Sequence, residues 1–274
     1  MNKVIWIYCF FICIIIRIQS KFYATYTWDT PSIELVRATE YAMQILEKYI
    51  NTTNDIHIEI GPRQFTNDAI IASSDTGKVV PHPQNEQLYI PISLYAQFKN
   101  DAPFGEPHVY VYINEHGRHP FYFGTDGKTP AGYMDFVTIL LHEIMHGLGF
   151  LTQFDDEQYY RLISAVYIYD YFIFRDMGIF PYGTHYPLKN STLLTDTTLF
   201  FHGIDNTTFQ IYTPPTFLKG SSINHAASKQ SLMYYNPSTG KSLHCLTPDC
   251  ILFLKTVGYT MYPSPPACLS VGNS

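Results

Sequence analysis

The stretch HEIMHGLGF, residues 142–150, places two histidines four residues apart, with a glutamate beside the first. Asp135 is a plausible cap seven residues earlier and two glycines follow, so the sequence predicts a helix that ends at the glycines. Residues i and i+4 lie one turn apart on the same helix face, so His142 and His146 can direct imidazole nitrogens at one ion. This spacing is typical of a catalytic zinc site, which requires a third protein ligand.

Glu143 projects near the same helix face without being forced to bind the ion. A carboxylate there can take a proton from a water that zinc activates, and can later pass it to a leaving amine. The alternative interpretation is an ordinary buried helix with two surface histidines. The apolar opposite face of the helix and the glycine break after it favour the metal site.

The third ligand does not follow at the compact spacing, because Thr152 stands where a three-histidine site of that kind would place it. A glutamate ligand from a later helix is disfavoured, because Glu157 is the only later glutamate and lies too close to the motif. Four later histidines are candidates: His185, His202, His225 and His244. His225 is favoured by its position eight residues before Met233, and His202 is the second candidate for the third ligand.

These motifs resemble those of the metzincin clan of zinc endopeptidases. The long insertion before the third histidine is similar to the leishmanolysin arrangement. The pattern HExxHGLGF … GSSxxH … LM is also similar to a group of secreted bacterial and eukaryotic metalloproteases. The resemblance covers roughly residues 108–260 and is strongest at two motifs. The matching residues are His142, Glu143, His146, Gly147, Leu148, Gly149, Phe150, Gly220, Ser221, Ser222, His225, Leu232 and Met233.

The resemblance implies an α+β fold with the two lobes of a metzincin-like protease. Residues 21–274 would form one domain, with an upper lobe of mixed sheet and helices over about 21–150. An irregular lower lobe over about 151–274 would end in a helix. The strand expected at 108–114 would lie at the sheet edge, where an extended peptide can add its backbone as a further strand.

The same resemblance implies the roles of the site residues. One catalytic Zn²⁺ would be held by His142, His146 and His225. Glu143 would act as general base and acid, and Met233 would form an apolar floor beneath the metal. The turn SLMYY is similar to the S-x-M-x-Y turn of astacin-like and serralysin-like enzymes, which would make Tyr235 a hydrogen-bond donor to the developing oxyanion. The alternative is that Tyr235 is a packing aromatic, since the nearer relatives lack this tyrosine.

Residues 1–20 have the composition of a secretory signal peptide: Lys3, an apolar run over 4–16, and a small residue at Ser20. The alternative is a membrane anchor, but about 13 apolar residues are fewer than the roughly 20 that span a bilayer. We therefore expect a secreted protein without stable membrane insertion after cleavage, and we assume a monomer. Three glycosylation sequons begin at Asn51, Asn190 and Asn206.

Cleavage at Ser20 would also leave three cysteines: Cys245, Cys250 and Cys268. A disulfide among them is expected in an oxidising compartment, with the pairing open. The remaining chain has 15 basic and 23 acidic residues, because Lys3 and Arg17 leave with the leader. This acidic balance argues against a nucleic-acid-binding protein.

The periodicity of the remaining chain predicts few regular elements with clear limits. Helices are expected at 31–50 and around 247–259, where Thr247 and Pro248 begin the helix and Gly258 ends it. Strands are expected at 56–61 and 108–114, with a loop-rich segment at 66–107 between them. A turn-forming linker is expected at 125–132. The aromatic segment at 151–219 is expected to be partly helical near 157–174.

The sequence therefore predicts a secreted zinc endopeptidase that acts on proteins or peptides. One alternative is a non-catalytic, zinc-stabilised protein that binds peptides in the same cleft. The glutamate at 143 argues against it, because binding alone needs no base there. A second alternative is a zinc hydrolase that acts on a non-peptide bond, which the expected edge strand disfavours.

Overall fold

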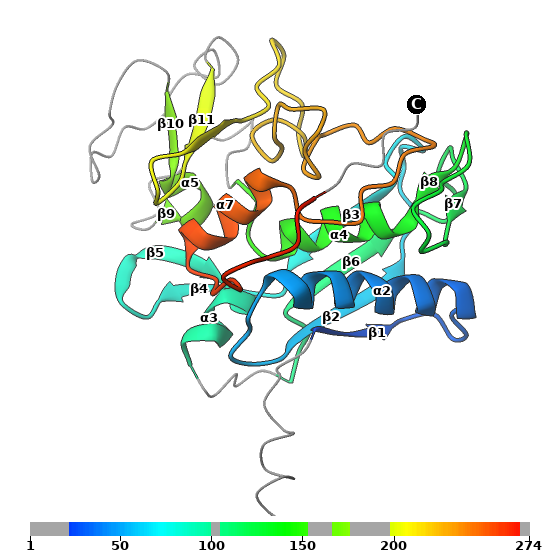
Figure 1. Cartoon of the computed structure of the whole chain (residues 1–274), viewed down its shortest axis with the longest axis horizontal. Helices are drawn as coiled ribbons and strands as arrows, with labels where there is room; N and C mark the ends of the chain where they lie inside the picture. Colours follow the sequence, from blue (N-terminus) through cyan, green and yellow to red (C-terminus); the bar gives the residue numbers. More distant parts are fainter. Residues whose placement is uncertain (1–21, 100–104, 153–165, 176–197, 269–274) are drawn as a thin grey trace, which may run out of the picture.

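The largest sheet carries two helices, α2 and α4, on one face (Figure 1). The computed structural model describes residues 22–99, 105–152, 166–175 and 198–268. The sheet has the order β1-β2-β6-β3, in which β1, β2 and β6 are parallel and β3 is antiparallel to β6. Its strands are β1 (Phe22–Tyr26), β2 (Ile56–Pro62), β6 (Val109–Ile113) and β3 (Ala72–Thr76).

Helix α2 (Ile33–Tyr49) confirms the amphipathic helix expected at 31–50. Its cap is Ser32, whose hydroxyl accepts a hydrogen bond from the backbone N–H of Leu35 at 3.1 Å. The residues expected on its apolar face are buried: Leu35, Ala38, Ala42, Ile45, Leu46 and Tyr49. This face packs against β1 and against α4, so the core lies between the sheet and the two helices.

The segment 66–107, expected to be mainly loop, contains more regular structure than the sequence indicates. Besides β3 it forms β4 (Val79–His82), β5 (Asn85–Pro91) and the short helix α3 (Ile92–Phe98). The sequence of β3 is ASSDT, and its side chains are exposed or half-buried. A strand held by backbone hydrogen bonds at a sheet edge needs no alternation of apolar residues, so the pattern gave no signal.

The prediction that the strand at 108–114 forms the sheet edge is wrong. Strand β6 lies between β2 and β3, and β3 is the end strand of this sheet among the described residues. The burial of β6 explains its position: Val109, Val111 and Ile113 are almost fully buried beneath the helices. An apolar strand of this kind needs neighbours on both sides, whereas the polar β3 tolerates an outer edge in water.

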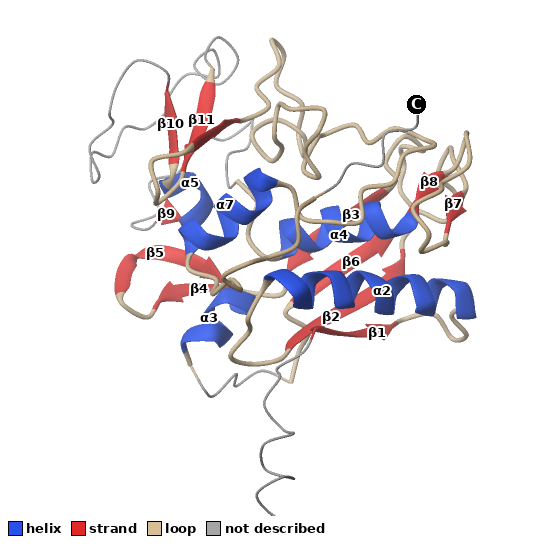
Figure 2. Cartoon of the chain, viewed as in Figure 1, coloured by secondary structure: helices blue, strands red, loops and turns tan. Residues whose placement is uncertain are grey.

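The second half of the described chain consists mainly of short elements (Figure 2). These elements pack together through aromatic rings. The elements are β9 (Val166–Tyr167), α5 (Ile168–Tyr171), β10 (Ile173–Arg175), β11 (Leu199–His202), β12 (Thr208–Gln210) and α7 (Pro248–Val257). A further pair, β7 (Phe121–Tyr122) and β8 (Met134–Asp135), precedes α4. The buried rings that join the two halves include Phe150, Tyr169, Phe201 and Phe253.

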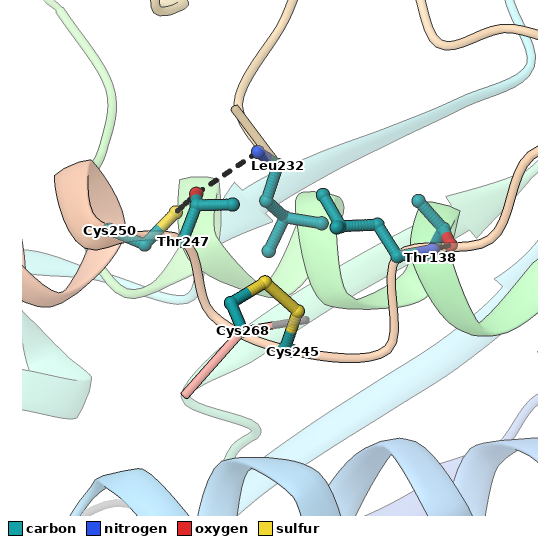
Figure 3. The surroundings of a disulfide bond; sticks show 7 residues. Thr138, Leu232, Cys245, Thr247, Cys250 and Cys268 are labelled. Carbon is teal, nitrogen blue, oxygen red and sulfur yellow. Dashed lines mark hydrogen bonds between the residues drawn. A yellow bond between two sulfur atoms is a disulfide. The ribbon is translucent and has the colours of Figure 1, made fainter. Parts of the chain in front are cut away.

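Helix α7 confirms the predicted C-terminal helix, with Pro248 in its first turn and Gly258 in the left-handed region at φ +115°. Thr247 holds the cap position, but its side chain makes no capping hydrogen bond. Its hydroxyl instead accepts the backbone N–H of Leu232 at 3.1 Å (Figure 3). The start of α7 is therefore tied to the segment that follows His225.

A disulfide joins Cys245 to Cys268, which confirms that a bond forms among these cysteines (Figure 3). Cys250 is a free, buried thiol on α7. Asn51 and Asn206 are exposed, whereas Asn190, the leader at 1–20 and about half of 151–219 lie outside the described residues. In the part of the chain that the structure describes, none of the helices has the length and hydropathy needed to cross a bilayer. The α+β fold class is confirmed.

Candidate metal centre

Helix α4 (Phe136–Gly147) begins at a well-bonded acidic cap, Asp135. The carboxylate accepts hydrogen bonds from the backbone N–H and hydroxyl of Thr138, at 2.8 and 2.7 Å, and from the hydroxyl of Thr129 at 2.6 Å. His244 lies 2.9 Å away through Nε2. Burial raises the pKa of the Asp135 carboxyl, but these hydrogen bonds outweigh it, and the pKa is lower than its ordinary value.

The glycines after the second histidine let the helix pack closely and then end. A Cβ at Gly147 would lie 2.1 Å from Cγ1 of Val109, so α4 lies directly against β6 there. Gly149 adopts φ +112°, which L side chains rarely adopt. The N–H of Phe150 then returns to the carbonyl of Met145 at 3.0 Å, which closes the helix end.

Three imidazoles converge at the C-terminal half of α4. His142 and His146 come from the helix, and His225 comes from the irregular segment between β12 and α7. One ligand atom from each lies within 4.8 Å of the others, and all three residues are buried. Nε2 of His142 and Nε2 of His146 are 3.2 Å apart. The structure thus brings together the three residues that the sequence assigned to the metal.

The orientation of each ring is fixed by its other nitrogen. Each Nδ1 faces a backbone carbonyl: His142 that of Leu232 at 2.7 Å, His146 that of Phe150 at 2.6 Å, and His225 that of Ser221 at 2.8 Å. A carbonyl only accepts, so Nδ1 must carry the proton and each Nε2 presents a lone pair. Two such lone pairs 3.2 Å apart repel each other unless a cation lies between them.

The spacing of these nitrogens suits a zinc ion. A tetrahedral ion about 2.0–2.1 Å from each nitrogen separates its ligand atoms by about 3.4 Å. Carbonyl partners on the distal nitrogens are also the usual device that orients metal-binding histidines. The donor set of three neutral imidazoles therefore fits zinc and leaves a fourth position for water or substrate.

The histidines are held in the form that binds metals. Burial lowers the pKa of His142 to about 4 and that of His225 to about 3, with His142 also lowering the latter. Burial and the two neighbouring imidazoles hold the pKa of His146 well below its ordinary value. Near neutral pH all three rings are unprotonated at Nε2, as coordination requires.

Glu143 lies beside the cluster and has one protein partner from the edge strand. Its side chain is buried, and the hydroxyl of Ser74 donates to Oε2 at 2.9 Å. Ser74 is paired with Val111 across the β3–β6 ladder, so it lies on the sheet face that α4 covers. Burial raises the pKa of the Glu143 carboxyl to about 7, although the Ser74 hydrogen bond opposes the shift. Ser74 could not be predicted from the sequence, because a serine in a polar strand carries no signal of this contact.

The segment around Met233 supports the first histidine through its backbone. Met233 is fully buried, and its N–H donates to the hydroxyl of Ser231 at 2.8 Å. Leu232 offers its carbonyl to His142 and its N–H to Thr247. The sequence pointed to this turn through Met233, but the contact with His142 is made by the preceding carbonyl. The expected role of Met233 as a floor beneath the metal stays a prediction.

Tyr235 stacks on Tyr212, with ring centroids 3.9 Å apart and planes 11° from parallel. Hydrogen bonds from Tyr212 and Tyr234 lower the pKa of Tyr235, whereas burial and the Tyr235 contact raise that of Tyr212 to about 12. The backbone N–H of Tyr212 donates to the carbonyl of His225 at 2.8 Å. The tyrosine pair therefore lies along the segment that supplies the third histidine.

The other histidine candidates lie elsewhere or outside the described residues. His202 is exposed on β11, with its ring 4.7 Å from that of Phe174. His244 is the partner of Asp135 at the start of α4. His185 lies outside the described residues. Among the described histidines, His225 is the one that joins the pair on α4.

Comparison with known proteins gives one partial match. A family model described as SPBPB7E8-like matches residues 88–213. The matched segment contains α4 with its two histidines and ends before His225. No curated protein and no solved structure matches the chain.

Proposed function

We propose that the protein is a secreted zinc-dependent endopeptidase with the two-lobed fold of a metzincin-like enzyme. The observation that carries the proposal is the triple of imidazoles whose Nδ1 atoms all face carbonyls and whose Nε2 atoms converge beside a buried glutamate. A structural zinc site is usually closed by four protein ligands, whereas three ligands and an adjacent carboxylate suit a hydrolytic site.

When bound, zinc supplies a Lewis acid that lowers the pKa of water and polarises a carbonyl. Glu143 accepts the proton of the attacking water and delivers it to the nitrogen that leaves as the peptide bond breaks. Burial raises the pKa of this carboxyl, which favours its role as the proton acceptor. Ser74 holds one carboxylate oxygen, which fixes the orientation of the group.

The substrate would bind as an added strand beside β3. The outer side of β3 has no neighbouring strand among the described residues, so its backbone groups can pair with an extended peptide. Ser74 lies on this strand and contacts Glu143, so a peptide paired with β3 lies next to the carboxylate. Edge pairing uses main-chain groups, which favours a protein or peptide substrate over other zinc-hydrolase substrates.

Tyr235 is proposed as a donor to the oxyanion that forms on the substrate carbonyl. Its hydroxyl is polarised by Tyr212, and the pair lies along the backbone of the His225 segment. Tyr235→Phe should lower kcat about 100-fold, the effect of losing one such donor, and leave zinc content unchanged. An unchanged kcat would make Tyr235 a packing aromatic.

The decisive experiment compares Glu143→Gln with the wild type on an unfolded protein substrate. We expect one zinc per chain in both, chelator-sensitive cleavage in the wild type, and about 1000-fold lower kcat in the variant. Glu86→Gln, a change at an exposed glutamate on β5, is the matched control and should keep full activity. Zinc-loaded wild type that binds peptides without cleaving them would instead be the non-catalytic peptide-binding protein.

Secretion is tested separately from catalysis. Expression of the full chain in eukaryotic cells should release a protein into the medium whose first residue is Lys21. Retention of the intact leader in a membrane fraction would show an anchor.

A further inference from the structure

Helix α5 contacts both halves of the candidate metal centre through two adjacent residues. The carboxylate of Asp170 accepts a hydrogen bond from the hydroxyl of Thr152 at 2.5 Å, and Thr152 lies just beyond the C-terminal end of α4. The hydroxyl of Tyr169 donates to the carbonyl of Ile223 at 2.8 Å, two residues before the third histidine. Helix α5 is therefore hydrogen-bonded both to the residue that follows α4 and to the backbone just before His225.

A direct bond closes the same connection. The backbone N–H of Thr152 donates to the side-chain oxygen of Asn224 at 2.7 Å, across 72 residues of sequence. Asn224 directly precedes His225. The side chains of Thr152, Asp170 and Asn224 are buried, at 7, 9 and 7% exposure, so water does not compete effectively for these bonds.

The backbone before His225 adopts a conformation that requires such support. Ile223 has φ +69°, in the left-handed region that a β-branched residue rarely enters, and its side chain is fully buried. Its N–H donates to the carbonyl of Tyr212 at 2.9 Å, and the N–H of Tyr212 returns to the carbonyl of His225. Strained backbone of this kind persists where surrounding contacts fix it.

We propose that Thr152, Tyr169 and Asp170 are positioning residues that set the third histidine against the pair on α4. Thr152 stands where a compact three-histidine site would have its third ligand, and in this chain it helps to hold His225, which takes that role. The inference depends on the proposed zinc site, but it does not depend on peptide cleavage. The hydroxyl of Tyr169 bonds to the backbone at Ile223, and the hydroxyl of Thr152 acts through Asp170, the neighbour of Tyr169 on α5, so neither hydroxyl needs to touch the ion.

The test measures zinc affinity of the full chain by competition with a chromophoric chelator. Thr152→Val removes the hydroxyl and keeps the backbone N–H, and Tyr169→Phe removes the hydroxyl and keeps the packed ring. Each should weaken zinc binding about 10-fold, the lower end for loss of an outer partner of a metal ligand. Thr152→Ser, which keeps the hydroxyl, should restore an affinity close to that of the wild type.

Thr256→Val is the matched control, because Thr256 is equally buried and its hydroxyl accepts the N–H of Ile204 rather than a group of the 221–225 segment. If Thr152 and Tyr169 only stabilise the fold, Thr152→Val and Tyr169→Phe should behave like the control: the melting temperature of the metal-free protein falls and the zinc affinity stays unchanged. That result in both test variants would overturn the proposal. A wild type that binds no zinc would overturn it together with the proposed function. Weaker zinc binding in both variants supports it even where no protease activity is found.

Discussion

The two parts of the candidate site are built in different ways. His142 and His146 lie on a regular helix whose cap, packing face and glycine end are all within or next to the sequence motif. His225 lies in an irregular segment that is bonded to residues far along the chain, such as Thr152 and Tyr169. The positions of two candidate ligands therefore follow from local structure, and that of the third from tertiary contacts.

This difference predicts that the two parts of the site respond differently to substitutions in the elements around them. The backbone hydrogen bonds of α4 set the spacing of His142 and His146, so a single substitution on a neighbouring element should change this spacing little. The position of His225 is fixed by several separate contacts around Ile223, whose backbone is strained. Loss of any one contact leaves the others, but it allows the segment to move relative to α4.

The largest effect should follow removal of a ligand from either part. His146→Ala and His225→Ala should each weaken zinc binding several hundred-fold, because each ligand contributes about 3–4 kcal/mol. Equal losses would show that both parts bind the same ion, and chelator competition measures them. His202→Ala changes an exposed histidine on β11 and should leave the affinity unchanged. A zinc loss in that variant would reassign the third ligand to His202.

The disulfide should matter more for the irregular part than for the helix. Cys245 and Cys268 close a loop of 23 residues, and loss of the bond in Cys268→Ser should lower the free energy of unfolding by about 3 kcal/mol. Urea unfolding measures the loss, and hydrogen exchange should rise at Leu232 and Thr247 before it rises in α4. Reducing agent should destabilise the wild type and have no further effect on the variant. Uniform exchange across α4 and the 232–247 segment would contradict the distinction between the two parts.

The helical part could be predicted from sequence because its signals are local. The spacing of His142 and His146, the cap at Asp135 and the glycines give the helix and two ligand positions without knowledge of the fold. The choice of His225 came from a motif resemblance, since 79 residues of chain allow many placements of a histidine. The contacts that hold it have no periodic pattern.

The edge strand could not be predicted for a related reason. Strand β3 forms because β6 offers it an open ladder, and its ASSDT sequence has no strand pattern of its own. The apolar β6 gave the clearest strand signal and was assigned to the edge, although its burial requires neighbours on both sides. A polar strand becomes recognisable only when its partner is known. Ser74 was missed together with it.

The cap of α4 gives a pH-dependent test of the helical part. The Asp135 carboxylate accepts its hydrogen bonds in the charged form, so Asp135→Asn should lower the free energy of unfolding by about 2 kcal/mol at pH 7. The folded pKa is below the unfolded one, so this stability is present above about pH 4 and is lost as pH falls through the folded pKa. The two proteins should converge in acid urea unfolding.

Ser32→Ala, at the uncharged cap of α2, is the control for this experiment. It should cost about 1 kcal/mol at every pH, since no titrating group is lost. A constant difference between wild type and Asp135→Asn down to pH 3 would show that the charge of Asp135 does not contribute.

The smallest effect should come from the contact that joins the edge strand to the helix. Ser74→Ala removes the hydroxyl that holds Oε2 of Glu143 and should lower kcat about 10-fold, or about 1.4 kcal/mol, with KM and zinc affinity unchanged. Ser74→Thr keeps a hydroxyl and should recover most of the rate, whereas Ser73→Ala, on the opposite face of β3, should have no effect. In a Glu143→Gln background, Ser74→Ala should cost nothing further, because the oriented carboxylate is already gone. A full additional loss in the double variant would mean that Ser74 acts on the substrate directly, and the edge strand would then belong to the binding surface alone.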